Sequence, residues 1–305
     1  METSTRNLRS KRALLIFNPQ SGLAIESPRQ LKDILSAMQA AKFITEVILI
    51  QPDFDVARMV QNALRRGIRM FVVSGGDGTI ETVAQQLLGT RATLGIIPTG
   101  TQNNLALSLG IPSEIPAAVA LLRSGKRIKI DVGLASCGEM RQSFLEVASV
   151  GLLSALFPAA DEIQHGNLVR IGDFLSTLVS SPPAHIHLVC DGKQELDTEG
   201  HVVLVANMPF FGAHYQVPIQ GTISDGFLDV LVFSNLTKLE LLQAAGNGMQ
   251  DPRIFHCHVH EVDILTEPLM PVLADGVSMG EGALHIQVQS RALTVMAGRK
   301  SQEMN

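Results

Sequence analysis

The sequence predicts an α/β domain, built as a parallel sheet flanked by helices, followed by a second domain that is mainly antiparallel β-structure. Up to residue 124, short apolar runs alternate with segments whose apolar residues recur at helical spacing. Such alternation favours a parallel sheet covered by helices on both faces. Beyond residue 133, strand-like runs bounded by turn residues dominate, which favours antiparallel pairing. We place the border between the two parts near Asp131 to Ala135.

Each element of the first part is predicted from its apolar pattern and its end signals. The predicted strands are 13–17, 46–50, 71–73 and 93–97. The predicted helices begin near Ser27, with Pro28 at the first helical position, and then cover 53–66, 80–88, a short segment after residue 104, and 113–124. The chain therefore contains four strand–helix units in succession.

The second part contains longer strand-like runs and few helical ones. The predicted strands are 144–150, 185–190, 201–207, 227–233, 254–265, 284–288 and 293–296, with helices near 152–163, 168–180 and 239–249. Asp191 and Gly192 form a dipeptide typical of a hairpin turn.

Composition excludes several classes of protein. The 305 residues have a net charge of −5, one Tyr and no Trp, which gives neither a basic footprint for nucleic acid nor aromatic stacking platforms. The cysteines are three in number and far apart in sequence, which indicates a reducing cytoplasm. No apolar run reaches the roughly 20 residues of a spanning helix. The basic residues up to Arg12 are either a solvated tail or a contact with an anionic membrane surface.

Three polar loops follow predicted strands of the first domain, at residues 18–22, 75–79 and 99–104. In a parallel sheet, ligands bind in the crevice outside the carboxyl ends of the strands, so we expect these loops to lie together. Glycines allow close approach of the backbone, and amides at a helix start favour a phosphate. Asp77 would repel a phosphate unless a cation lies between them. The loops therefore predict a metal–nucleotide site; the alternative is an ordinary strand-to-helix turn with an acidic cap.

The order of the motifs resembles one known family across nearly the whole chain. The motifs are Asn18-Pro-x-Ser-Gly22, Gly75-Gly-Asp-Gly-Thr79, Pro98-x-Gly-Thr-x-Asn103, Asp131-x-Gly133 and Asp225-Gly-x-Leu-Asp229. Together they resemble the bacterial diacylglycerol kinases and lipid kinases, whose superfamily includes sphingosine kinases and NAD kinases. The resemblance implies a nucleotide-binding α/β domain over 1–133, to which 289–305 return, and a β-sandwich lipid or substrate domain over 134–288. It also implies an active site in the cleft between them.

The resemblance also implies roles for particular residues. The nucleotide site would be formed by Asn18, Ser21, Gly22, Gly75, Gly76, Asp77, Gly78, Thr79, Gly100, Thr101, Asn103 and Asn104. Asp77 and Asp131 would be catalytic, organising magnesium and water around the phosphates of ATP. Thr222, Asp225 and Phe227 would hold a structural Mg²⁺, an ion that prefers oxygen ligands. Without the resemblance, Asp225 and Gly226 are equally consistent with a plain hairpin turn.

The sequence departs from the family at three acidic positions. The glutamate of the late Asp-Gly-Glu motif, the usual candidate base, is Val277 here. The family's Asn-Asp is Asn103 and Asn104, and its Asn-Glu after the glycine loop is Glu81 and Thr82. A positioned base contributes about 10²–10⁴-fold. Asp77 could replace it, whereas Glu281 is better explained as a solvated loop residue.

Two further patterns have competing explanations. Apolar helices at 152–163 and 168–180 could form the wall of an acyl-chain cleft, but ordinary core packing explains them better. His256, His258 and His260 lie on one face of a predicted strand. They could bind zinc, but neighbours on a strand face rarely converge on one tetrahedral centre, so a polar outer face is the better explanation.

We therefore predict a cytoplasmic, ATP- and Mg²⁺-dependent lipid kinase of the diacylglycerol kinase type that phosphorylates a lipid such as diacylglycerol. Peripheral contact with the inner membrane surface stays open. The sequence does not decide whether the chain forms a homodimer. The first alternative is a non-catalytic relative that binds nucleotide or lipid as a sensor. The second is an NAD kinase-like enzyme, whose adenosine-binding Asn-Glu pair is not apparent. No Walker P-loop and no G-x-G-x-x-G motif is present.

Overall fold

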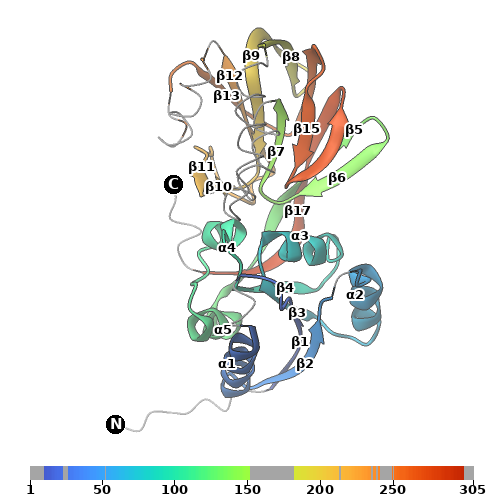
Figure 1. The fold of residues 1–305 in the computed structure, drawn as a ribbon, viewed down its shortest axis with the longest axis vertical. Helices are drawn as coiled ribbons and strands as arrows, with labels where there is room; N and C mark the ends of the chain where they lie inside the picture. Colours follow the sequence, from blue (N-terminus) through green and yellow to red (C-terminus); the bar gives the residue numbers. More distant parts are fainter. Residues whose placement is uncertain are drawn as a thin grey trace, which may run out of the picture. The chain divides into compact units, whose positions relative to one another are not determined.

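A computed structural model describes residues 10–22, 27–51, 53–151, 182–212, 214–234, 236–237, 240, 249 and 251–298 (Figure 1). Internal contacts divide the chain into two compact units. Among the described residues, the first unit comprises Ser10 to Lys129 and Leu293 to Gly298, and the second runs from Ile130 to Ala292. Strands β5 (Lys126–Cys137) and β17 (Leu284–Ala297) therefore contribute residues to both units.

The first unit is built on a parallel sheet. Its strands are β1 (Lys11–Phe17), β2 (Phe43–Leu49), β3 (Met70–Gly75), β4 (Thr93–Pro98) and the last residues of β17. They lie in the order β17-β4-β3-β1-β2, and every pair in this order is parallel. Strands β1, β3 and β4 are buried almost throughout, as expected for a sheet covered on both faces.

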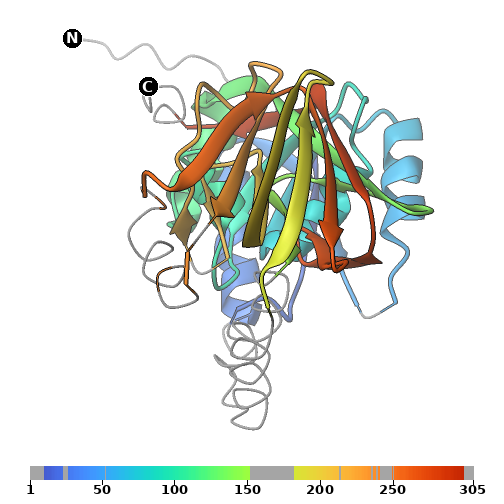
Figure 2. The same ribbon diagram turned by 90° about the horizontal axis from the view of Figure 1, so that it is seen from above.

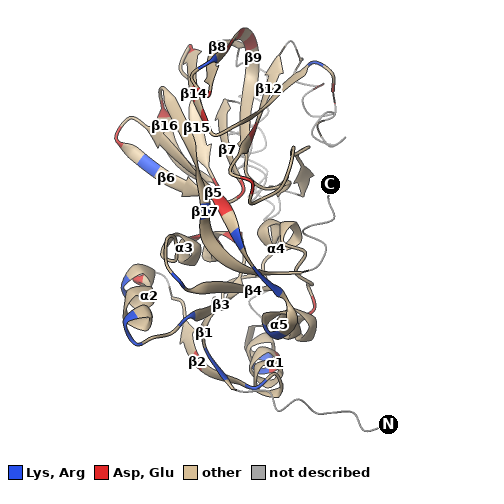
Figure 3. Ribbon diagram, turned by 180° about the vertical axis from the view of Figure 1, so that it is seen from behind, with Lys and Arg blue, Asp and Glu red and all other residues tan. Residues whose placement is uncertain are grey.

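Helices cover both faces of this sheet (Figure 1). They are α1 (Ser27–Ala40), α2 (Val56–Arg65), α3 (Asp77–Gln85), α4 (Asn104–Ser108) and α5 (Ile115–Ser124). Helices α1 and α5 pack on each other, as do α2 and α3. The start of α2 is fixed by Asp55, whose carboxylate accepts a hydrogen bond from the amide of Arg58. Lys and Arg are spread over α1, α2 and α5 instead of forming one stripe (Figure 3).

The second unit is antiparallel. Its strands are β5 (Lys126–Cys137), β6 (Met140–Phe144), β7 (Val147–Gly151), β8 (Ala184–Cys190), β9 (Gln194–Ala206), β10 (Phe210–Phe211), β11 (Tyr215–Gln216), β12 (Leu228–Ser234), β13 (Ile254–Val259), β14 (Glu261–Glu267), β15 (Pro271–Ala274), β16 (Val277–Glu281) and the first residues of β17. The strand order is β16-β15-β7-β9-β8-β14-β17, and β12 joins β9 to β13. The strands coloured yellow to red lie side by side in Figures 1 and 2.

Strand β9 organises the second unit because it has three partners. Its first half pairs with β8, and its second half pairs with β7 on one side and β12 on the other. The pairing partners of β9 change near Gly200. An added Cβ there would lie 2.7 Å from the carbonyl oxygen of Phe233, so the close approach of β12 requires a glycine. Inward-facing aliphatic side chains of β8, β9, β12 and β14 form the main core of this unit.

The structure confirms the predicted fold class and corrects several elements. The predicted strand 254–265 is two strands, β13 and β14, and 144–150 divides between β6 and β7. The last two predicted strands, 284–288 and 293–296, form a single strand, β17. Strands β5, β15 and β16 were not predicted.

The predicted helices 152–163 and 168–180, with the acyl-chain wall proposed for them, lie outside the described residues. Nearly all of the predicted helix 239–249 does so too. Within the described part of the chain, no helix has the length and apolar character needed to cross a membrane.

Candidate functional site

The three polar loops of the first unit meet at the carboxyl ends of β1, β3 and β4. The side-chain amide of Asn18 donates to the hydroxyl of Thr79 at 2.8 Å, which joins the first loop to the second. The buried hydroxyls of Ser74 and Thr99 lie 3.1 Å apart, which joins the second loop to the third. Strands β1 and β3 are neighbours in the sheet. The chain continues from β1 to β2 on one side and from β3 to β4 on the other. Such a reversal of strand order is where open α/β sheets bind their ligands.

The glycines of these loops bring their backbones into contact. A Cβ added to Gly100 would lie 2.3 Å from the Cα of Gly76, and one added to Gly76 would lie 3.6 Å from the hydroxyl of Ser21. Gly22 has a φ of +67° and lies against the carbonyl of Thr99. Only residues without a side chain allow this approach, so the glycines are explained by packing between the loops as well as by a ligand.

Asp77 is the first residue of α3, and its carboxylate reaches the start of α4. It accepts hydrogen bonds from the amides of Asn104 at 3.2 Å and Leu105 at 3.3 Å. Burial raises the pKa of Asp77, and these hydrogen bonds oppose the rise. The side chain is half-buried and lies among the loops, so it is available to a polar ligand there.

The third loop is shaped by Asn103. This residue has a φ of 55°, its side-chain oxygen accepts from the amide of Gly100 at 2.9 Å, and its side-chain nitrogen donates to the carbonyl of Gly100 at 2.7 Å. The exchange closes a tight turn in which Thr101 is exposed. Asn104 follows as a buried residue and begins α4. The predicted residues of all three loops are thus brought together within the first unit.

Asp131 belongs to a separate cluster in the second unit. Its buried carboxylate accepts hydrogen bonds from the amides of Gly226 and Arg291, each at 2.6 Å. Burial raises its pKa, and both hydrogen bonds lower it. Asp131 thereby fixes the loop of Thr222 to Phe227 against β5 and the middle of β17.

The predicted magnesium loop is closed by its own aspartate. The Asp225 carboxylate accepts from the amide of Thr222 at 2.6 Å and from that of Phe227 at 3.1 Å. A Cβ on Gly221 would lie 2.2 Å from the same carboxylate, so the loop depends on a glycine there. One carboxylate with main-chain carbonyls fits a hard cation that keeps some of its water. Among the described residues, no cluster of His, Cys, Asp or Glu side chains is arranged to hold a metal ion.

The turn before Val277, the position at which the family has glutamate, contains an aspartate with a structural role. Asp275 accepts hydrogen bonds from the amides of Glu146 and Val147 at 3.0 and 2.9 Å, and also from that of Leu145. Val277 begins β16 and is 41% exposed, so no packing requirement selects a valine there. Glu281 is exposed, as expected, but it is the last residue of strand β16 and not a loop residue.

The three histidines near residue 258 pair with aspartates on neighbouring segments. His256 and His258 of β13 lie 2.8 and 3.3 Å from the same carboxylate oxygen of Asp229 in β12. His260 and His258 both pack on the ring of Phe227. These contacts support a polar outer face that braces the 222–227 loop.

Sequence reasoning missed Asn207 and assigned no role to Asp229, which it noted only as part of a motif. Asn207 donates to the carbonyls of Asp131 and Leu145, joining both acidic turns of the second unit, and Asp229 anchors the amide of Gln220. Asn207 directly follows the apolar run of β9, a position at which it could have been suspected.

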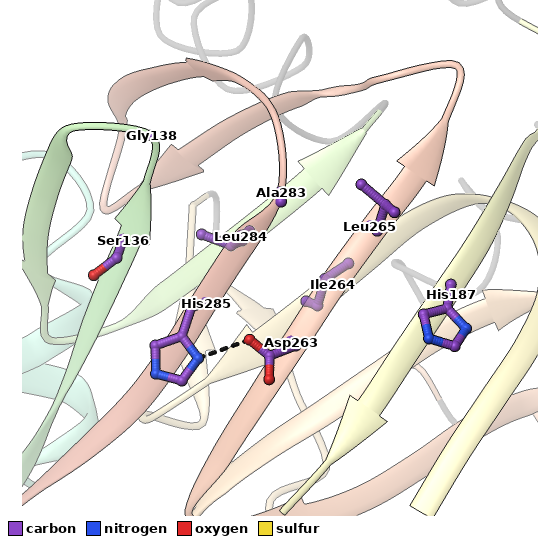
Figure 4. A pocket seen from close by; sticks show the side chains of 9 residues that line it. All are labelled: Ser136, Gly138, His187, Asp263, Ile264, Leu265, Ala283, Leu284 and His285. Carbon is purple, nitrogen blue, oxygen red and sulfur yellow. Dashed lines mark hydrogen bonds and ion pairs between the residues drawn. The ribbon is translucent and has the colours of Figure 1, made fainter. Parts of the chain in front are cut away.

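The second unit has a groove of about 310 Å³, and none of the residues that line it was predicted to belong to the functional site (Figure 4). Its polar side chains include Asp263 and His285, which contact each other at 2.8 Å. His187 lies on the neighbouring strand and pairs with Asp197. Because these charged and polar side chains already pair with one another, the groove does not indicate a ligand site.

Comparison with known proteins identifies the family. The family model described as the diacylglycerol kinase catalytic domain matches residues 12–135, and that described as the YegS C-terminal NAD kinase beta sandwich-like domain matches residues 160–297. The chain carries the diacylglycerol kinase catalytic domain. The match to the first model spans the three loops and Asp131, and the match to the second spans the 222–227 loop and Val277.

Two relatives cover most of the length of the chain. A diacylglycerol kinase of Bacillus subtilis is 28% identical over 87% of the chain and 89% of its own length. A Pseudomonas aeruginosa protein named probable lipid kinase YegS-like is 29% identical over 80% of the chain and 81% of its own length.

Solved structures share the fold. A diacylglycerol kinase structure from Bacillus anthracis has a TM-score of 0.74 at 24% identity, covering 95% of this chain and 98% of that one. An Archaeoglobus fulgidus NAD kinase in complex with ATP has a TM-score of 0.54 at 16% identity, covering 96% of each chain.

Proposed function

We propose that this protein is an ATP- and Mg²⁺-dependent lipid kinase that transfers the γ-phosphate of ATP to a hydroxyl group of diacylglycerol or a similar lipid. The observation that carries the proposal is the convergence of three strand-end loops at Gly76 and Gly100 in a chain that carries the diacylglycerol kinase catalytic domain. Phosphoryl transfer requires mainly positioning and charge stabilisation, and a glycine-lined backbone cradle supplies both to a triphosphate.

In this proposal, the first unit holds the nucleotide. The main-chain amides of Gly76 and Gly78 bind phosphate oxygens, and Asn18 keeps Thr79 in place through its 2.8 Å hydrogen bond. Mg²⁺, when bound, offsets the negative charge of the phosphates. The mixed carboxyl and main-chain oxygens of Thr222, Asp225 and Phe227 would hold a structural ion of the same kind.

Asp77, which is half-buried, and Asp131, which is buried, have different roles in this proposal. Asp77 lies among the nucleotide loops and has a pKa raised by burial, which makes its carboxylate a stronger base than an exposed one. It therefore accepts the proton of the lipid hydroxyl, in place of the family glutamate. Asp131, whose oxygens are both occupied by amides, orders the turn that carries Asp225 and thereby supports the proposed structural ion.

Val277 supports a second candidate, a nucleotide- or lipid-binding sensor without turnover. A valine cannot accept a proton, and its exposure means that packing does not explain it. The two candidates differ in one measurable property, which is whether ATP is consumed when lipid is added.

The experiment is an assay of the purified full-length chain with ATP labelled in its γ-phosphate. The acceptors are diacylglycerol, monoacylglycerol, a sphingoid base, phosphatidylglycerol and NAD, each with Mg²⁺, and Asp77→Asn is the control variant. A labelled lipid that disappears in the variant supports the kinase. Binding of ATP without any labelled product supports the sensor, and a labelled NAD product alone contradicts both.

A further inference from the structure

Two of the cysteines, far apart in sequence, are in contact in the second unit. Cys190 is the last residue of β8 and Cys257 lies within β13, 67 positions later. Their sulfur atoms are 2.7 Å apart. Both side chains are free thiols in the core, with residue exposures of 3% and 8%.

The backbone around both cysteines is fixed by hydrogen bonds. Cys190 pairs with Val262 of β14, and Cys257 pairs with Val230 of β12. The turn after Cys190 is tied to the corner between β13 and β14, because Asp191 accepts from the amides of His260 and Glu261 at 2.8 and 3.0 Å. These bonds hold the two Cα positions in place, so the distance between the sulfur atoms changes only through side-chain rotation.

The contact is close to the geometry of a covalent bond. A disulfide has a sulfur–sulfur distance of about 2.03–2.05 Å, so the two atoms need to approach by only about 0.7 Å. We propose that Cys190 and Cys257 form a redox modification site, at which a peroxide converts the two thiols into an intramolecular disulfide.

The chemistry has two steps. The thiolate of Cys190 attacks one peroxide oxygen, so that a sulfur–oxygen bond forms, the oxygen–oxygen bond breaks and hydroxide leaves. The sulfur of Cys257 then attacks the sulfenic acid, the sulfur–sulfur bond forms, and the oxygen leaves as water with the proton of Cys257. Two thiols and one peroxide yield one disulfide and two waters. A dithiol reductant reverses the change.

The environment assigns the order of attack. The hydrogen bond from Cys257 lowers the pKa of Cys190, whereas the same bond and burial raise the pKa of Cys257. Cys190 is therefore the attacking thiolate and Cys257 the resolving thiol. Burial raises the pKa of Cys137, the third cysteine, which makes it a less reactive internal reference.

The new bond would stabilise the strand that supports the 222–227 loop. Cys257 lies between His256 and His258, the two residues that contact Asp229. A cross-link between β8 and β13 closes a long loop, which restricts the unfolded chain. We expect the midpoint of thermal unfolding to rise by about 5–10 °C on oxidation and to return on reduction.

The test uses the full-length chain, first reduced with dithiothreitol and then treated with hydrogen peroxide near stoichiometric amounts. Thiols are titrated after denaturation, and peptides are mapped by mass spectrometry. We expect the accessible thiols to fall from three to one and a single cross-linked peptide to join residues 190 and 257. The Cys137→Ser variant keeps this response, and Cys190→Ser and Cys257→Ser lose it.

The wild-type mapping decides the question even if a serine variant folds poorly. Three thiols remaining after peroxide, a bond that includes Cys137 or joins two chains, or sulfinic acid without a disulfide would each overturn the proposal. A cross-link at the expected pair without any change in thermal unfolding would overturn the stabilising role.

Discussion

The Cα of Gly76 occupies the space that a side chain on Gly100 would need, at 2.3 Å from its ideal Cβ position. Gly100→Ala must therefore displace backbone, not a flexible side chain. Overpacking of this kind costs about 1–3 kcal/mol. We expect the variant to unfold at lower temperature and, under the proposed function, to lose the stabilisation that ATP should give the wild type.

Gly78→Ala is the matched control for the effect on folding. Nothing lies within 4 Å of its ideal Cβ position, and it lies in the first turn of α3. Because alanine is favoured over glycine in helices by about 1 kcal/mol, the control should unfold at the same temperature or higher. Equal thermal midpoints for both variants would show that the two loops are not packed as described.

Asp77→Asn tests the proposed base. Removing a general base lowers the rate by about 10²–10⁴-fold, so we expect a loss of this size in labelled lipid. Asp33→Asn on the exposed side of α1 is the control, with unchanged activity expected. Equal activity in both variants would exclude Asp77 from the reaction.

The same variant has a predicted pH dependence of stability. Burial raises the pKa of Asp77 in the folded state, so its contribution to stability is fully present below the unfolded pKa and is lost as pH rises through the folded value. Asparagine does not titrate. The thermal midpoint of Asp77→Asn relative to wild type should therefore increase from pH 4 to pH 7. A constant or decreasing difference would contradict the raised pKa.

The site of the first unit was more predictable than that of the second. The loops after β1, β3 and β4 were expected to meet because parallel strands end at one edge of a sheet. The contact of Asp77 with the amides of Asn104 and Leu105 was not predictable, because it depends on where α4 begins, 27 residues later.

The strand boundaries of the second unit were missed for one physical reason. Where a predicted strand is divided in two, the backbone amides at the division donate hydrogen bonds to the carboxylate of a distant turn. Asp275 accepts from the amides of Leu145 to Val147, and Asp191 accepts from those of His260 and Glu261. Apolar patterns carry no information on such contacts. Strand β5 was missed because its exposed first residues include Lys126 and Arg127, which conceal the apolar pattern.

Val277→Glu tests whether the missing glutamate limits the rate. The site is 41% exposed at the start of β16, so we expect a change in stability within about 0.5 kcal/mol. If a base is limiting, lipid phosphorylation should rise by up to about 10²–10⁴-fold. Val277→Gln has nearly the same shape without the acid and should not gain activity. Equal gains in both variants would indicate a change in substrate binding instead of base catalysis.

Asp131→Ala tests the buried connection in the second unit. It removes the acceptor of two amide hydrogen bonds, those of Gly226 and Arg291. An unsatisfied buried donor costs about 1–3 kcal/mol, so we expect the free energy of unfolding in urea to fall by that amount or more. Asp263→Ala, at an exposed strand position, should change it by less than about 0.5 kcal/mol. Similar losses in the two variants would contradict the bracing role of Asp131.

Asp225→Ala tests the predicted magnesium loop. In the wild type, Asp225 closes the loop with two hydrogen bonds and leaves further lone pairs for a cation. Mg²⁺ that binds only the folded chain stabilises it by mass action, so the thermal midpoint should rise with Mg²⁺ concentration and fall after chelation. The variant should lose this dependence on Mg²⁺ in the absence of ATP, whereas Asp251→Ala, at an exposed ion pair with Arg253, should keep it. A wild-type midpoint indifferent to Mg²⁺ would remove the structural ion from the proposal and leave the nucleotide-linked one to be tested by activity alone.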